Sequence, residues 1–163
     1  MLAVFDHPAP VVAAVNGHAI AGGCVFAMAA DVRLMSAGTI GITELVVGVP
    51  FPMAALEICR YGMGTSVRRA ALQADTIDVA AASARGIDEV VAPADLIPRA
   101  IAVAHELRQH APTAYAATKE QLHRPARTAI GAGAETDAKV RASWMSDDTR
   151  ARVTAFIDAL ARD

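Results

Sequence analysis

The chain has 163 residues, of which 54% are hydrophobic and only 4% aromatic, and its formal net charge is −2 at pH 7. This length fits one domain with a core of small aliphatic side chains. The charge balance, with no basic run of five residues, argues against a nucleic-acid-binding face. The longest apolar stretch, residues 19–30, is shorter than the roughly 18–20 residues of a membrane span, so we expect no membrane partner.

The first half alternates short apolar runs with turn residues, which is typical of an α/β fold. The Val-rich run before Asn16-Gly17 predicts a strand that is buried on both faces. Pro52 suits the first position of a helix that Gly62 and Gly64 end. In chain order we expect a strand at 10–15, a buried helix at 22–30 closed by Asp31, a strand at 32–35, strand and loop at 39–49, and a helix from Pro52 to about Arg60.

The second half is mostly helical. Ser66 and Ser146 are each expected to cap the helix that follows, and Pro125 to lie beyond the end of a helix. The expected elements are helices at 67–74 and 79–85, a strand at 87–91, and helices at 96–110, 113–123, 128–144 and from 146 onward. This pattern divides the chain into an α/β part, residues 1–92, and a helical part, residues 93–163.

Two features suggest chemistry. Gly22-Gly23 opens an apolar helix, and the bare N–H groups of a helix N-terminus can stabilise an oxyanion. Glu44 lies among Ile, Val and Leu, and apolar surroundings raise the pKa of a carboxyl group toward the range useful for proton transfer. Together they predict enolate chemistry with one catalytic acid. The alternatives are that the glycines allow close packing and that Glu44 is a surface carboxylate.

Several common sites are excluded by spacing. The glycines do not form a dinucleotide fingerprint or a phosphate-binding loop, and no nucleophile elbow occurs. His105 and His110 are five residues apart, so they do not share a helix face as a zinc pair would, and we expect no metal site. Cys24 and Cys59 lie in apolar segments and are expected to be buried reduced thiols.

The sequence of residues 10–24, Pro-Val-Val-Ala-Ala-Val-Asn-Gly-His-Ala-Ile-Ala-Gly-Gly-Cys, resembles the signature of the enoyl-CoA hydratase/isomerase (crotonase) superfamily. Glu44 followed by Gly48 resembles the second catalytic segment of that family. Residues 81–91 and 116–119 resemble its later blocks. The resemblance implies a crotonase-like α/β spiral of ββα units within residues 1–92, without its N-terminal part, followed by C-terminal helices.

The resemblance also implies roles for single residues. Gly22 becomes the oxyanion donor and Glu44 the catalytic carboxylate. Val25 stands where family hydratases have a first glutamate, and valine cannot transfer a proton. Family isomerases resemble this chain in keeping only the later glutamate, which favours shifting a 3-enoyl-CoA double bond to 2-enoyl-CoA. The implied substrate-binding residues are Ile20, Ala21, Gly22, Val25, Thr43 and Pro52.

Other readings remain open at this point. They are hydration, thioester hydrolysis and non-catalytic acyl-CoA binding. The family has an N-terminal segment before the first strand seen here, with a second oxyanion donor, so we expect the sequence to be the C-terminal portion of a subunit. We further expect an acyl-CoA substrate, no cofactor, a homotrimer or dimer of trimers, and a cytoplasmic location. Arg68, Arg69 and Lys119 are expected on solvated helix faces rather than at CoA phosphates.

Overall fold

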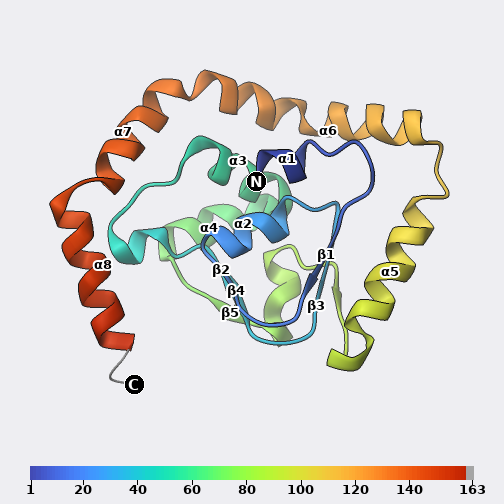
Figure 1. Ribbon diagram of the computed structural model, residues 1–163, viewed down its shortest axis with the longest axis horizontal. Coiled ribbons are helices and arrows are strands. Elements are labelled where there is room, and N and C mark those ends of the chain that lie inside the picture. The colour runs from blue at the N-terminus through green and yellow to red at the C-terminus, as the bar shows by residue number, and fades with distance from the viewer. Residues whose placement is uncertain (161–163) are drawn as a thin grey trace.

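The computed structural model describes residues 1–160 and places two small sheets side by side, surrounded by helices (Figure 1). One sheet has the strand order β1-β3-β6 and is parallel throughout. The other has the order β2-β4-β5, with β2 and β4 parallel and β5 antiparallel. The strands are β1 (Val12–Val15), β2 (Ala19–Ile20), β3 (Val32–Met35), β4 (Thr39–Gly41), β5 (Ile77–Asp78) and β6 (Glu89–Val90).

The helices connect the strands and then continue alone beyond β6. Helix α2 follows β2, α3 follows the loop after β4, and α5 lies beside β1 (Figure 1). The α-helices are α1 (Leu2–Phe5), α2 (Gly22–Met28), α3 (Met53–Met63), α4 (Val67–Gln73), α5 (Leu96–Leu107), α6 (Pro112–Ala132), α7 (Ala134–Trp144) and α8 (Asp147–Leu160). The 3-10 helices are η1 (Glu44–Val47), η2 (Gly64–Ser66), η3 (Val79–Arg85) and η4 (Pro93–Asp95).

The main core lies between α2, α3 and the second sheet. Its fully buried side chains include Met28, Ile40 and Ile58. Cys24 and Cys59 are both free thiols with no exposed surface, as the sequence predicted. A smaller cluster under α5 contains Leu34, Leu96, Ala100 and Val103. The prediction that the helix at 22–30 is entirely buried is wrong for part of α2, because Gly22 and Gly23 are exposed and Phe26 is 52% exposed.

Several predicted boundaries in the second half are wrong. Helix α6 continues through Pro125, although proline removes an internal hydrogen bond. Both neighbours on the inner face, His123 and Ala126, are buried, and this packing keeps the helix continuous. The segment predicted as one helix at 128–144 is divided at Gly133, between α6 and α7. In the first half, the expected strand and loop at 39–49 are β4, which ends at Gly41, and a loop that contains η1.

The predicted caps have different outcomes. Ser146 caps α8, because its Oγ accepts the N–H of Thr149 at 3.2 Å. Ser66 does not cap α4: its hydroxyl donates instead to the Met63 carbonyl at 2.9 Å. Pro52 precedes α3 as its N-cap rather than forming its first residue, and α3 runs past Gly62 to Met63.

The described helices include none that is both long and apolar enough to cross a membrane.

Candidate active site

The sheet β2-β4-β5 brings Gly22 and Glu44 to one place. Strands β2 and β4 are parallel neighbours in which Ile20 pairs with Gly41. The next N–H, that of Ala21, donates to the Gly41 carbonyl at 2.9 Å. Parallel strands that lie side by side end at the same edge of their sheet. The start of α2 and the start of η1, which follow these two strand ends, therefore share that edge.

The start of α2 is shaped by an unusual backbone conformation. Ala21, its N-cap, has φ 51° and ψ −121°, a combination that glycine adopts easily and alanine rarely. Gly22 and Gly23 follow, and both are exposed. A Cβ placed on either glycine would meet no atom within 4 Å, so close packing is not the reason for these glycines. The first N–H groups of a helix have no acceptor within the helix, so those of Gly22 and Gly23 are available to a ligand.

Glu44 is a buried carboxylate rather than a surface one. It is the first residue of η1 and is 7% exposed. Its Oε2 is buried and has no hydrogen-bond partner among the described residues. Burial raises the pKa of Glu44, and hydrogen bonds from the backbone of Glu44 and Thr43 oppose that rise. A raised pKa makes this carboxylate a stronger base than an exposed glutamate.

The side chains around this edge are apolar. Val25, one turn after Gly22, is 1% exposed and belongs to the core. Ile20, Phe26, Leu45 and Val46 leave between 39% and 52% of their surfaces exposed, although they are large and hydrophobic. Exposed apolar side chains of this size are suited to contact an apolar ligand or another protein surface.

Thiols lie behind the site. Cys24 on α2 and Cys59 on α3 are neighbours, and the pKa of the Cys59 thiol is raised by Cys24, by burial and by the nearby charge of Glu44. A raised pKa keeps a thiol protonated and unreactive. These two cysteines therefore act as core residues.

The two remaining predicted binding residues lie farther along the Glu44 segment. Thr43 is the half-buried N-cap of η1, and its carbonyl accepts the Val46 N–H at 2.9 Å. Pro52 lies at the other end of the loop, before α3, in a cavity of about 440 Å³ that it shares with α7. The structure thus brings Ile20, Ala21, Gly22 and Thr43 to the edge where Glu44 lies, while Pro52 faces the C-terminal helices.

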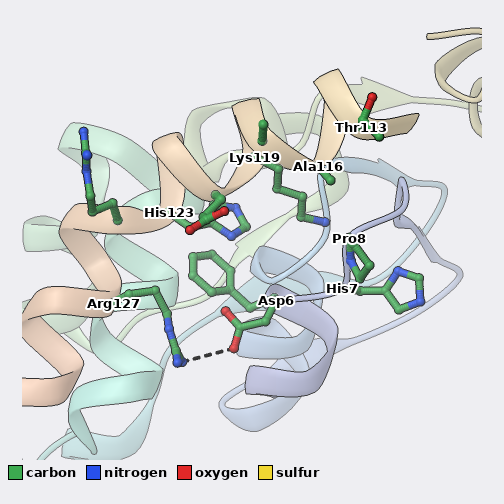
Figure 2. Close-up of a pocket in the computed structure, with 12 residues that line it drawn as sticks. Asp6, His7, Pro8, Thr113, Ala116, Lys119, His123 and Arg127 are labelled. Carbon is green, nitrogen blue, oxygen red and sulfur yellow. Dashed lines mark ion pairs between the residues drawn. The ribbon is translucent and has the colours of Figure 1, made fainter. Parts of the chain in front are cut away.

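A separate cavity of about 750 Å³ lies between the loop after α1 and helix α6 (Figure 2). It contains many charged groups, but the structure neutralises several of them. Lys119 binds Asp31 at 2.8 Å, and Arg127 binds Asp6 at 3.1 Å. His123 stacks on Phe5 with a ring separation of 3.7 Å. Neither Gly22 nor Glu44 lines this cavity.

Lys119 contradicts the sequence prediction. It was expected on a solvated helix face, but it is 6% exposed and its Nζ points to Asp31. Asp31 also accepts the Val11 N–H at 2.8 Å, which confirms its structural role at the end of α2. Arg68 and Arg69 are exposed on α4, which agrees with the predicted solvated helix face, and His105 and His110 are exposed as well. Sequence reasoning gave no role to His123 or Asp137, because neither lies in a recognisable motif.

Comparison with known proteins identifies the family. The family model described as enoyl-CoA hydratase/isomerase matches residues 1–161. The chain belongs to the enoyl-CoA hydratase/isomerase family. Its α/β fold is therefore the crotonase-like fold that the sequence predicted, and the structural neighbours agree with this assignment.

Three relatives illustrate the range of this family. A probable enoyl-CoA hydratase of Mycobacterium leprae is 31% identical over 157 residues, which cover 93% of this chain and 61% of the relative. An enoyl-CoA delta isomerase of Arabidopsis thaliana is 34% identical over 91 residues, which cover 53% of this chain and 38% of the relative. The structure of an enoyl-CoA isomerase of Mycobacterium tuberculosis superposes with a TM-score of 0.78 at 36% identity, covering 84% of this chain and 62% of that one.

The family contains both reactions, and the relatives do not choose between them. The curated relatives include several hydratases, beside the plant isomerase. The chain spans between 48% and 61% of the length of three such relatives. The choice of reaction and of substrate is therefore argued below from the residues of the site.

Proposed function

We propose that this chain carries the catalytic carboxylate of an enoyl-CoA isomerase, which converts a 3-enoyl-CoA to a 2-enoyl-CoA. The observation that carries the proposal is the buried Glu44, with an unpartnered Oε2, at the sheet edge where α2 begins. Val25 supplies a second argument, because a family hydratase would have a glutamate at this position.

The proposed reaction needs one carboxylate and one oxyanion donor. Ionised Glu44 removes a proton from C2 of the thioester, and the electrons of that bond move to the thioester oxygen to form a dienolate. The Gly22 N–H donates a hydrogen bond to that oxygen. The same proton, now on Glu44, returns to C4, and the double bond moves from C3–C4 to C2–C3. Atoms and charge balance without a metal or redox cofactor.

The raised pKa of Glu44 supports this role. A carboxylate whose charge is disfavoured by burial is a stronger base toward the weakly acidic C2–H bond. The exposed Ile20, Phe26, Leu45 and Val46 offer apolar contacts for the acyl chain. Binding the thioester also covers the carboxylate and excludes water, which strengthens the hydrogen bond to the enolate oxygen.

Hydration is the second candidate, because several relatives are hydratases. It requires a positioned water and two proton-handling groups. In this chain Val25 is fully apolar and almost completely buried. A hydratase would therefore have to recruit another carboxylate, and thioester hydrolysis would have the same need.

The decisive assay uses both substrates with the complete natural polypeptide. We expect turnover of a 3-enoyl-CoA, followed by formation of its 2-enoyl product, and little addition of water to a 2-enoyl-CoA. Introducing the missing group in Val25→Glu is the complementary test and should raise hydration relative to isomerisation. Faster hydration than isomerisation by the unmodified protein would overturn the proposal, and binding without turnover would favour the non-catalytic alternative.

A homotrimer or a dimer of trimers remains our proposal for the assembly, by analogy with the family. The cytoplasmic location and the division at residue 92 also remain predictions.

A further inference from the structure

The segment that carries Glu44 is held from outside by the C-terminal helices. Helix α3 begins at Met53, nine residues after Glu44, and its first N–H donates to Oδ1 of Asp137 on α7 at 2.8 Å. These two residues are 84 positions apart in the sequence. Asp137 is half-buried. In Figure 1, α7 and α8 pass along the outer side of the molecule, around the η1–α3 region.

The sequence before α3 explains why an external acceptor is needed. The N-cap of α3 is Pro52, which has no side-chain oxygen and forms no side-chain cap. The first N–H groups of a helix have no acceptor within the helix. A carboxylate at this end also interacts favourably with the helix dipole. Asp137 therefore replaces the N-cap residue that the local sequence lacks.

Two close approaches of side chains to glycines add to this contact. Gly133, where α6 meets α7, lies against Met53, and a Cβ there would come within 2.9 Å of the Met53 Cβ. Gly48, at the end of η1, lies under Arg152 of α8, whose Cδ would be 2.8 Å from a Cβ at that glycine. The C-terminal helices thus contact both ends of the loop 48–53.

The loop between these contacts is stiff. Pro50 and Pro52 each fix one backbone dihedral, and Val49 is fully buried. The Val49 N–H donates to the carbonyl of Glu44 at 3.2 Å. A displacement at Met53 is therefore transmitted along the loop to Glu44 rather than absorbed by it.

We propose that Asp137 is a positioning residue, which fixes the start of α3 and thereby the place of the Glu44 carboxylate at the sheet edge. The role in catalysis rests on the proposed function, whereas the effect on Glu44 does not. Asp137 does not contact the substrate in the proposed mechanism. It acts only through Met53 and the loop that precedes it.

Asp137→Ala is the direct test, because it removes the acceptor and leaves Met53 in place. Asp137 lines the 440 Å³ cavity beside Pro52, so water can reach the freed N–H and the variant is expected to fold. Asp137→Asn keeps an acceptor oxygen and is expected to retain wild-type behaviour. Glu135→Ala is the matched control, since Glu135 lies on the same helix and bonds only to the exposed Lys139 within the described residues.

Two measurements distinguish an effect on the position of Glu44 from an effect on the stability of the fold alone. The first is the titration of the Glu44 side-chain carboxyl, followed by carbon NMR. In Asp137→Ala we expect its pKa to fall toward the ordinary value of 4.5 as water reaches it. The second is isomerase turnover, for which we expect kcat to fall about tenfold with KM little changed, because small displacements of a catalytic group are costly. The acid limb of the kcat profile should shift with the carboxyl titration.

The result that overturns the proposal is a folded Asp137→Ala with the same Glu44 titration and the same kcat as Glu135→Ala. If the alanine variant does not fold, Asp137→Ser repeats the test with a side chain too short to reach the Met53 nitrogen. An inactive wild-type protein would contradict the proposed function, and the Glu44 titration would still decide the role of Asp137.

Discussion

Replacing Lys119 by Met tests the internal ion pair that fixes α6 to the rest of the fold. Lys119 Nζ lies 2.8 Å from Oδ2 of Asp31, and the two side chains are only 7% and 12% exposed. Methionine keeps the length and the apolar stem of lysine but removes the charge. Asp31 then remains half-buried, with the Val11 N–H and the Tyr115 hydroxyl as neighbouring donors. The substitution therefore leaves a carboxylate that is only partly compensated.

The expected loss follows from this geometry. Removing one partner of a buried pair costs about 3–5 kcal/mol. The bond from Val11, the Tyr115 hydroxyl and the partial exposure of Asp31 favour the lower limit, so we expect about 3 kcal/mol. For a chain of this size, that loss lowers the Tm by about 6–12 °C. By contrast, Lys139→Met breaks only an exposed pair with Glu135 and should change stability by less than about 0.5 kcal/mol.

Urea unfolding, followed by circular dichroism at pH 7, gives both free energies. The double variant Asp31→Asn/Lys119→Met should recover part of the loss, because it removes the unpaired charge. If Lys119→Met lowers the free energy of unfolding no more than Lys139→Met does, the ion pair between Lys119 and Asp31 does not stabilise the fold as we argue.

Two further predictions follow from strain and from burial. Ala21→Gly should raise the free energy of unfolding by about 1 kcal/mol, because glycine adopts φ 51° without strain; an unchanged or lower urea midpoint would contradict this. The pKa of His123 is lowered by burial and by Lys119, against the opposing charges of Asp31 and Asp6. Its contribution to stability is therefore complete above the ordinary pKa of 6.5 and is lost as the pH falls below it, since the unfolded chain binds the proton first. The Tm should thus fall more between pH 7.5 and 5.5 in the wild type than in His123→Phe, and equal falls would exclude this residue as the cause.

Local patterns in the sequence were sufficient to predict the elements that form the site. The Val-rich run at β1, the glycine pair at α2 and the lone Glu44 each lie within a few residues of the feature they determine. The apolar neighbours of Glu44 correctly indicated burial. The parallel pairing of β2 and β4 then brings Gly22 and Glu44 to the same edge.

Contacts between distant residues could not be predicted in this way. Pro125 indicates a helix end by itself, but the burial of His123 and Ala126 outweighs that preference. Lys119 and Asp31 are 88 positions apart, and Asp137 and Met53 are 84 apart. No local pattern predicts such pairs. A charged residue on an amphipathic helix fits a solvated position as well as an ion pair with a distant residue.

The single-carboxylate mechanism is tested most directly by the isomerase turnover of Glu44→Gln, measured beside Glu57→Gln. Glu57 is also buried, at 8% exposure, but it pairs with Arg60 on α3 and has no part in the mechanism. General acid–base groups contribute roughly 10²–10⁴-fold to rate, so we expect kcat to fall at least a hundredfold in Glu44→Gln. The Glu57 variant, where it folds, should retain most of the wild-type kcat. Wild-type turnover of 3-enoyl-CoA by Glu44→Gln would contradict the account.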